Sequence, residues 1–182
     1  ANFLADASLL RHALSTRTVI ADGAMGTMLQ AADPSLEDFQ SYEGCNEILN
    51  ISRPDIVKAV HRQYLEVGCD AIETNTFGAN FANLSEYEIP DRIYELAFAG
   101  AKLAREVADE FSEPKYVLGS IGPGTKLPTL GHIDFEKLRS TYFECAKGLV
   151  DAGSDALLIE TSQDLLQTKA AIIAAREAID AA

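Results

Sequence analysis

The stretch Asp155-Ala156-Leu157-Leu158-Ile159-Glu160-Thr161 carries the first clue to the architecture of this chain. Its unbroken apolar run, between an aspartate and a Glu-Thr pair, predicts a strand buried on both faces, as in parallel sheets. A second stretch repeats the design as Gly68-Cys69-Asp70-Ala71-Ile72-Glu73-Thr74-Asn75. Because α/β enzymes place their chemistry at the carboxyl ends of buried strands, both glutamates are candidates for one functional edge.

Composition narrows the class of protein. The chain has 182 residues, 47% of them hydrophobic and 24% charged, which suits one globular domain with a substantial core. Its formal net charge of −13 argues against binding to nucleic acids or anionic membranes, whose phosphates attract lysine and arginine. No apolar run reaches the length of a membrane span, and residues 1–14 lack the basic start and apolar core of a signal peptide.

Several residues of chemically active types have a structural explanation. The three cysteines, Cys45, Cys69 and Cys145, show no paired spacing, which predicts a reducing, cytoplasmic setting. Cys45 has no metal-ligating partner nearby in the sequence, so the favoured interpretation is a small packed residue. We predict a solvated loop position for His132 and a surface or packing position for His61.

The glycine-rich segment Gly122-Pro123-Gly124-Thr125-Lys126 does not predict a nucleotide site. A P-loop needs a Gly-Lys-Ser/Thr ending after four intervening residues, and the dinucleotide fingerprint needs a different glycine spacing. The segment instead begins a long loop, 126–133, at the same edge as the other strand ends. The glycines around Asp22 predict either a tight turn where the backbone closely approaches another group or a plain loop with an Asx turn.

Strands and helices are predicted to alternate along the chain. The predicted strands cover 18–21, 69–73, 116–121 and 155–160. The predicted helices cover 5–15, 34–39, a segment capped by Ser52 and ended by Gly68, a short polar stretch after Asn80, 91–111, a segment from the Asp134 cap to 152, and a segment that Ser162 or Asp164 caps and that ends at 179. Such alternation predicts an α/β fold with a parallel sheet and right-handed crossovers.

Two α/β architectures fit this alternation: an open doubly wound sheet, or part of a (β/α)8 barrel. Barrel enzymes gather functional residues from the carboxyl ends of several strands around one opening. Polar side chains stand at the predicted strand ends, at Asp22, Glu73, Asn75, Ser120 and Glu160. This arrangement favours the barrel. The chain would then contain an N-terminal helix followed by four strand–helix units, which is half of a (β/α)8 barrel.

Five motifs follow one another in a specific order. They are Asp22-Gly23-Ala24-Met25-Gly26-Thr27, Gly44-Cys45-Asn46-Glu47, Glu73-Thr74-Asn75-Thr76-Phe77, Gly119-Ser120-Ile121-Gly122-Pro123 and Ile159-Glu160-Thr161. Together they resemble the homocysteine S-methyltransferase family, and most closely the N-terminal homocysteine-binding module of its cobalamin-dependent, actinobacterial members. The resemblance runs from Val19 to residue 182. It implies a (β/α)8 TIM barrel, of which residues 1–182 would be the N-terminal half.

The resemblance also implies a reaction and its binding residues. Members of the family transfer a methyl group to the sulfur of homocysteine, which gives methionine. Asp22 and Glu160 match two carboxylates of the family and would hold the α-amino group of homocysteine, because carboxylates neutralise an ammonium and accept its hydrogen bonds. Main-chain N–H groups near Gly23 and Ser120 could hold the α-carboxylate of homocysteine.

Three residues at the end of the second predicted strand complete the candidate site. Glu73, Asn75 and Thr76 would shape and polarise the pocket floor, although Glu73 is equally well explained as a carboxylate bonded within the barrel. The candidate substrate-binding residues are therefore Asp22, Gly23, Glu73, Asn75, Thr76, Ser120 and Glu160.

The cofactors that the resemblance implies are expected outside this chain. In the family, a zinc ion on three cysteine thiolates binds the homocysteine sulfur and keeps it a nucleophilic thiolate. None of Cys45, Cys69 and Cys145 matches a zinc-binding position, so we expect the zinc ligands beyond residue 182. Methylcobalamin, recharged from methyltetrahydrofolate, is the methyl donor of the closest members, and we expect cobalamin and folate modules in the parent chain.

We therefore expect a fragment of a longer methyltransferase that is inactive alone. A half barrel would expose unpaired edges on its first and fourth strands, which predicts self-association or low stability of the fragment. Two other functions stay open. One is a zinc homocysteine S-methyltransferase with another methyl donor, such as S-methylmethionine, and the other is a non-catalytic half barrel that serves as a binding or assembly unit.

Overall fold

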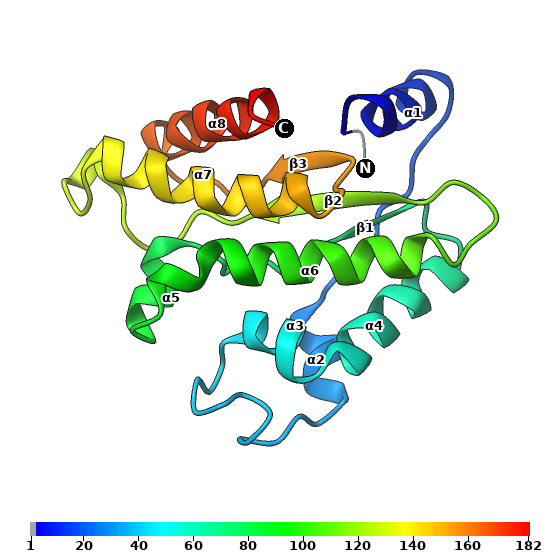
Figure 1. The fold of residues 1–182 in the computed structure, drawn as a ribbon, viewed down its shortest axis with the longest axis horizontal. Helices are drawn as coiled ribbons and strands as arrows, with labels where there is room; N and C mark the ends of the chain where they lie inside the picture. The colour runs from blue at the N-terminus through cyan, green and yellow to red at the C-terminus, as the bar shows by residue number, and fades with distance from the viewer. Residues whose placement is uncertain (1–2) are drawn as a thin grey trace.

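A parallel sheet with strand order β1-β2-β3 lies at the centre of the chain (Figure 1). The structure is a computed structural model that describes residues 3–182, with side chains from Ser8 onward. The strands are β1 (Ala71–Glu73), β2 (Tyr116–Ile121) and β3 (Ala156–Ile159). Their parallel registers bring Glu73, Ser120 and Glu160, which lie at or just past the carboxyl ends of the three strands, to the same edge of the sheet. The predicted α/β class with a parallel sheet is therefore confirmed.

Helices connect and cover the strands. The α-helices are α1 (Phe3–Thr16), α2 (Gly26–Ala31), α3 (Leu49–Ser52), α4 (Pro54–Glu66), α5 (Phe81–Glu86), α6 (Ile93–Ala108), α7 (Phe135–Asp151) and α8 (Leu165–Asp180). Short 3-10 turns are η1 (Asn46–Ile48), η2 (Pro90–Arg92) and η3 (Pro128–Leu130). In Figure 1, α6 and α7 run side by side across the sheet, and their inward residues form the largest core cluster together with residues of α8. None of the helices in the described part of the chain is long and apolar enough to cross a bilayer.

The first predicted strand, 18–21, is wrong as a regular strand. Only one parallel bridge joins Ala21 to Ala71, although the Ile20 carbonyl accepts the N–H groups of Asp70 and Ala71 at 2.7 and 3.1 Å. A continued ladder would next join the Glu73 N–H to the Asp22 carbonyl. That N–H donates instead to the Asp22 carboxylate, at 3.0 and 3.1 Å, so the side chain ends the ladder.

The strand β3 is less buried than the sequence predicted. All four of its residues are partly exposed rather than enclosed on both faces. Within residues 3–182, β3 pairs only with β2, so its other edge has no strand beside it. Residues of α1 and α8, including Leu10 and Ile172, line a groove with Leu157 and Ile159 on that side.

Most of the predicted helices form, but two local predictions are wrong and two short helices were missed. The segment 34–39 makes turns, because the Asp38 carboxylate accepts bonds from the N–H and hydroxyl of Ser35 and competes with helical bonding. Ser52 does not cap α4, since its hydroxyl donates to the Ile48 carbonyl at 3.2 Å and Pro54 opens the helix instead. The short helices α2 and α3 were not predicted.

Two carboxylates begin the long helices as predicted. Asp134 accepts the N–H groups of Glu136 and Lys137 at the start of α7. Asp164, rather than the alternative Ser162, accepts those of Leu166 and Gln167 at the start of α8. These caps satisfy helix N–H groups that have no partner within the helix.

Candidate functional site

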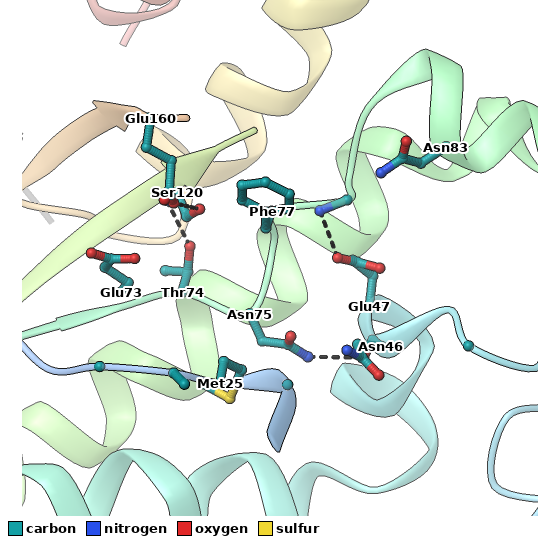
Figure 2. A pocket seen from close by; sticks show the side chains of 15 residues that line it. Met25, Asn46, Glu47, Glu73, Thr74, Asn75, Phe77, Asn83, Ser120 and Glu160 are labelled. Atoms are coloured by element: carbon teal, nitrogen blue, oxygen red, sulfur yellow. Dashed lines mark hydrogen bonds between the residues drawn. The ribbon is translucent and has the colours of Figure 1, made fainter. Parts of the chain in front are cut away.

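A cavity of about 510 Å³ opens at the carboxyl edge of the sheet. Its volume lies within the range of small-molecule pockets. The turn after the Ala21 bridge, the approach to η1, the turn after β1, and the ends of β2 and β3 form its walls (Figure 2). Five of the seven predicted binding residues line it: Gly23, Glu73, Asn75, Ser120 and Glu160. Asp22 and Thr76 lie directly behind the lining and hold parts of it in place.

Three carboxylates lie at or directly behind one end of this cavity. Asp22 is joined to the main chain of Glu73, and the Ser120 hydroxyl donates to Glu160. Glu73 faces Glu160 from the neighbouring part of the edge, as Figure 2 shows. We call Asp22, Glu73 and Glu160 the acidic end of the cavity. Such a cluster favours a bound cation, because each carboxylate repels the others until a positive charge lies among them.

Two of these carboxylates, Asp22 and Glu73, are poorly solvated, which raises their pKa values. The pKa of Asp22 is raised to about 7, mainly by burial and in smaller part by the nearby charges of Glu73 and Glu160, against the lowering effect of the Glu73 N–H bond. Burial, and then the charge of Glu160, also raises the pKa of Glu73. A ligand ammonium would favour the charged forms of both groups. Glu73 lines the cavity and also shares a side-chain hydrogen bond with Glu160, so its two predicted roles, in the pocket floor and as a carboxylate bonded within the fold, both stay predictions.

A strained turn follows Glu160 immediately. Thr161 has φ of +52°, a left-handed conformation that a β-branched residue rarely adopts. The turn ends β3 and leads the chain toward α8. Because strain of this kind persists where the surrounding structure holds it, it marks the end of β3 as a constrained part of the site.

Hydroxyl groups join the ends of β1 and β2. The Thr76 hydroxyl donates to the Ser120 carbonyl at 2.7 Å, and the Ser120 N–H donates to Thr74 Oγ1 at 3.0 Å. The two threonine hydroxyls are 2.6 Å apart. The Ser120 N–H itself is therefore occupied, so a ligand carboxylate near Ser120 would have to use a neighbouring main-chain N–H group. The position of Gly23, exposed in the cavity wall, remains compatible with that role.

The turn that carries Gly23 is held by a tyrosine of α4. The Tyr64 hydroxyl donates to the Ala24 carbonyl at 2.9 Å. A Cβ atom at Gly23 would lie 3.2 Å from the Tyr64 oxygen, which is a tight contact. The group that the backbone at Gly23 closely approaches is therefore the Tyr64 side chain of the same protein.

The structure adds cavity residues that the sequence did not single out. They include Met25, Asn46, Glu47, Phe77, Gly78 and Asn83. Glu47 and Phe77 stand in the motifs Gly44-Cys45-Asn46-Glu47 and Glu73-Thr74-Asn75-Thr76-Phe77, so motif membership was an available signal. Their place in the cavity depends on contacts between segments about thirty residues apart, which the sequence pattern does not reveal.

The three cysteines do not form a metal site. Each is buried and free, and the described residues hold no group of three histidine, cysteine or carboxylate side chains placed to bind a metal ion. Burial raises the pKa of Cys45 and of Cys145 to about 12, which disfavours the thiolate form that zinc requires. The packing interpretations of Cys45 and His61 are confirmed, and His132 is exposed in its loop.

Comparison with known proteins places the chain among relatives. The family model described as Homocysteine S-methyltransferase matches residues 19–182. The methionine synthase of Mycobacterium tuberculosis (strain ATCC 25618 / H37Rv) is 56% identical over 179 residues, which cover 97% of this chain and 15% of that protein. The methionine synthase of Mycobacterium leprae (strain TN) is 53% identical over 173 residues, covering 93% and 14%. The chain thus spans about one seventh of the length of these curated relatives.

A similar fold occurs in solved structures. The homocysteine methyltransferase MmuM from Escherichia coli, in its oxidized form, superposes with a TM-score of 0.75 and 22% identity, covering 92% of this chain and 61% of that one. Its metallated form gives a TM-score of 0.74 over 92% and 62%. At this identity the likeness concerns the fold.

Proposed function

The chain belongs to the homocysteine S-methyltransferase family, and from this premise we propose that it forms the N-terminal homocysteine-binding part of a methionine synthase. Identities of 53 and 56% to two methionine synthases, over more than nine tenths of the chain, support this function. The reaction would be transfer of a methyl group to the sulfur of homocysteine, which yields methionine. The domain would be the first four βα units of a (β/α)8 barrel, in line with the fold of the E. coli methyltransferase.

The observation that carries this proposal is the acidic end of the cavity. Homocysteine has an α-ammonium group, and Asp22 and Glu160 approach one another from the first and last segments of the sheet edge. Two carboxylates would accept N–H bonds from that ammonium and neutralise it, with Glu73 beside them. Ser120 holds Glu160 through its hydroxyl, so the accepting oxygens stay oriented.

The role of these residues would be to bind and orient the substrate. With its ammonium fixed at the acidic end, the thiol side chain of homocysteine would extend along the cavity past Phe77, whose ring stands in the wall (Figure 2). A thiol packs favourably against an aromatic ring. This chain would thereby place the sulfur for a methyl donor that approaches through the cavity opening.

The cofactors of such an enzyme would be held elsewhere. The cysteines of this chain do not fit a zinc site, so we propose that the zinc ligands, and the modules for cobalamin and folate, belong to other parts of the parent enzyme. The three free cysteines suit a reducing compartment, and we propose the cytoplasm.

Binding of homocysteine to the complete enzyme tests the proposal. We expect Asp22→Asn and Glu160→Gln each to raise the dissociation constant by about 10- to 100-fold, the usual effect of losing one charge-assisted bond. The bound metal should stay unchanged. Glu66→Gln, at an exposed position at the end of α4, is the matched control and should bind normally. Normal affinity in both site variants would refute the assignment.

A methyltransferase that uses another donor, such as S-methylmethionine, is the second candidate. The fold likeness to MmuM at 22% identity does not favour it over the methionine synthases, which are far more similar in sequence. Turnover of homocysteine with S-methylmethionine, and none with methylcobalamin, would decide for this candidate.

A further inference from the structure

Glu47 is a buried carboxyl group at the end of the cavity away from Glu160. It belongs to η1 and is 8% exposed. Its Oε1 accepts the main-chain N–H of Gly78 at 2.7 Å, and its Oε2 lies 3.7 Å from the thiol of Cys45. Figure 2 shows the carboxyl group pointing at the turn that follows β1, on the other side of Phe77 from Ser120. The carboxyl group thus contacts the backbone of a cavity wall directly.

The turn leaves no free space around this contact. A Cβ atom on Gly78 would lie 2.7 Å from Oε1 of Glu47 and 3.0 Å from its carboxyl carbon. At the preceding residue, the Phe77 carbonyl oxygen lies so close to Gly122 that a Cβ atom on Gly122 would clash with it. The backbone of Phe77 and Gly78 is therefore enclosed between η1 and the chain after β2. On the η1 side, the Glu47 side chain supplies the polar contact to the Gly78 N–H.

A second set of bonds joins the same two segments. Asn75 donates from Nδ2 to the Asn46 carbonyl at 2.8 Å and to the side-chain oxygen of Asn50 at 2.9 Å. Asn50 returns a bond from its own Nδ2 to the Asn75 carbonyl at 2.8 Å. Segment 46–50 thus holds both ends of the turn that runs from Asn75 to Gly78. The asparagine pair fixes its beginning and Glu47 fixes its end.

We propose that Glu47 is a positioning residue for the substrate: its carboxyl group holds the turn after β1 so that Glu73, Asn75 and Phe77 surround the bound ligand. This inference rests on the proposed homocysteine site. It assigns to Glu47 no charge contact with the substrate, because the Gly78 N–H already uses one carboxyl oxygen and the Cys45 thiol lies at the other. Burial also raises the pKa of Glu47, which is compatible with a neutral group in the same place.

Two substitutions separate positioning from direct substrate contact. Glu47→Gln keeps an oxygen that can accept the Gly78 N–H, and Glu47→Ala leaves that N–H without a partner. In the complete enzyme we expect Glu47→Ala to raise the KM for homocysteine about tenfold with kcat within about twofold, as a lost hydrogen bond of this kind would. Glu47→Gln should restore KM to within about twofold of the wild type. Glu43→Ala, exposed in the preceding loop, is the matched control.

The amide of Gly78 gives a readout that needs no substrate. We expect its hydrogen exchange to accelerate at least tenfold in Glu47→Ala and to stay near the wild-type rate in Glu47→Gln. Gly78→Ala disrupts the same contact from the other side and should also raise the KM for homocysteine. It takes the place of Glu47→Ala in the test if Glu47→Ala folds poorly. Thermal melts identify that case.

Three outcomes overturn the inference. If Glu47→Gln is as impaired in KM as Glu47→Ala, the carboxylate acts on the ligand through its charge. If Glu47→Ala leaves KM unchanged, or leaves Gly78 exchange unchanged, Glu47 does not position the turn. Failure of the proposed function is a different result, because the wild-type enzyme would then not bind homocysteine and Asp22→Asn would change nothing.

Discussion

Both carboxylate oxygens of Asp22 accept the main-chain N–H of Glu73, at 3.1 and 3.0 Å. The side chain takes the place that the Asp22 carbonyl would have in a continued parallel ladder. This shared hydrogen bond ends the pairing of segment 18–21 with β1. It also holds the Asp22 side chain beside Glu73. The acidic end of the cavity is built by interrupting the sheet at this point.

Replacement of Asp22 by asparagine should change the pH dependence of stability. Its pKa is raised to about 7 in the folded protein, so the folded state retains a proton that the unfolded state loses near pH 4. The free energy of unfolding of the wild type should therefore fall as the pH rises from about 4 to 7. The Asp22→Asn variant should not show this fall. We expect the variant to be more stable at pH 8 by roughly 2 kcal/mol, a value reduced for partial exposure. Urea unfolding at pH 5 and 8 measures the difference, and an equal loss in both proteins would contradict it.

The buried His61 should act in the opposite direction. Within the described residues its side chain is fully buried and neither ring nitrogen has a hydrogen-bond partner. Burial lowers its pKa to about 4, whereas in the unfolded chain it takes a proton near pH 6.5. Stability should therefore fall as the pH drops from about 6.5 to 4. His61→Leu removes this effect and should be more stable at pH 4.5 by about 2 to 3 kcal/mol.

Unfolding curves at pH 4.5 and 7.5 check the His61 prediction. His12→Leu, at an exposed position in α1, is the control and should not change the slope with pH. If His61→Leu loses as much stability at low pH as the wild type does, groups other than His61 cause that loss.

Removal of the Thr76 hydroxyl should weaken the join between the ends of β1 and β2. Thr76→Val keeps the shape of the side chain and leaves the Ser120 carbonyl and the Thr74 hydroxyl short of a partner inside the protein. We expect a loss of about 1 to 3 kcal/mol in the free energy of unfolding. Chemical denaturation measures it, with Thr125→Val, an exposed position in the loop after β2, as the control. Equal losses in the two variants would contradict the prediction.

The turn after Glu160 should be relieved by glycine. Thr161 adopts a left-handed backbone conformation with φ of +52°, which glycine adopts without strain. We expect Thr161→Gly to keep or raise stability by up to about 1 kcal/mol, and Thr161→Val to have no such gain. If the glycine variant also weakens homocysteine binding, the rigidity of this turn contributes to the position of Glu160. Melting temperature and titration of homocysteine measure the two effects separately.

Much of this site could be predicted from the one-dimensional pattern. Apolar runs of strand length followed by glutamates at positions 73 and 160, alternating with helical periodicity, indicated a parallel sheet with one functional edge. Because carboxyl ends of parallel strands lie at the same edge, Glu73, Ser120 and Glu160 could be placed together before any contact was known. The caps at Asp134 and Asp164 were also local enough to be predicted.

Only the tertiary structure decided which long-range bonds each group makes. The sequence contains Asp22 and Glu47, but their contacts lie with Glu73 and Gly78, 51 and 31 residues away. It contains Ser120, but its N–H proves to be taken by Thr74. Local patterns reflect the preference of a segment for one conformation and one buried face. The partner of a polar group depends instead on how several segments pack, which determines where the ladder at Asp22 ends and which side chains surround the cavity.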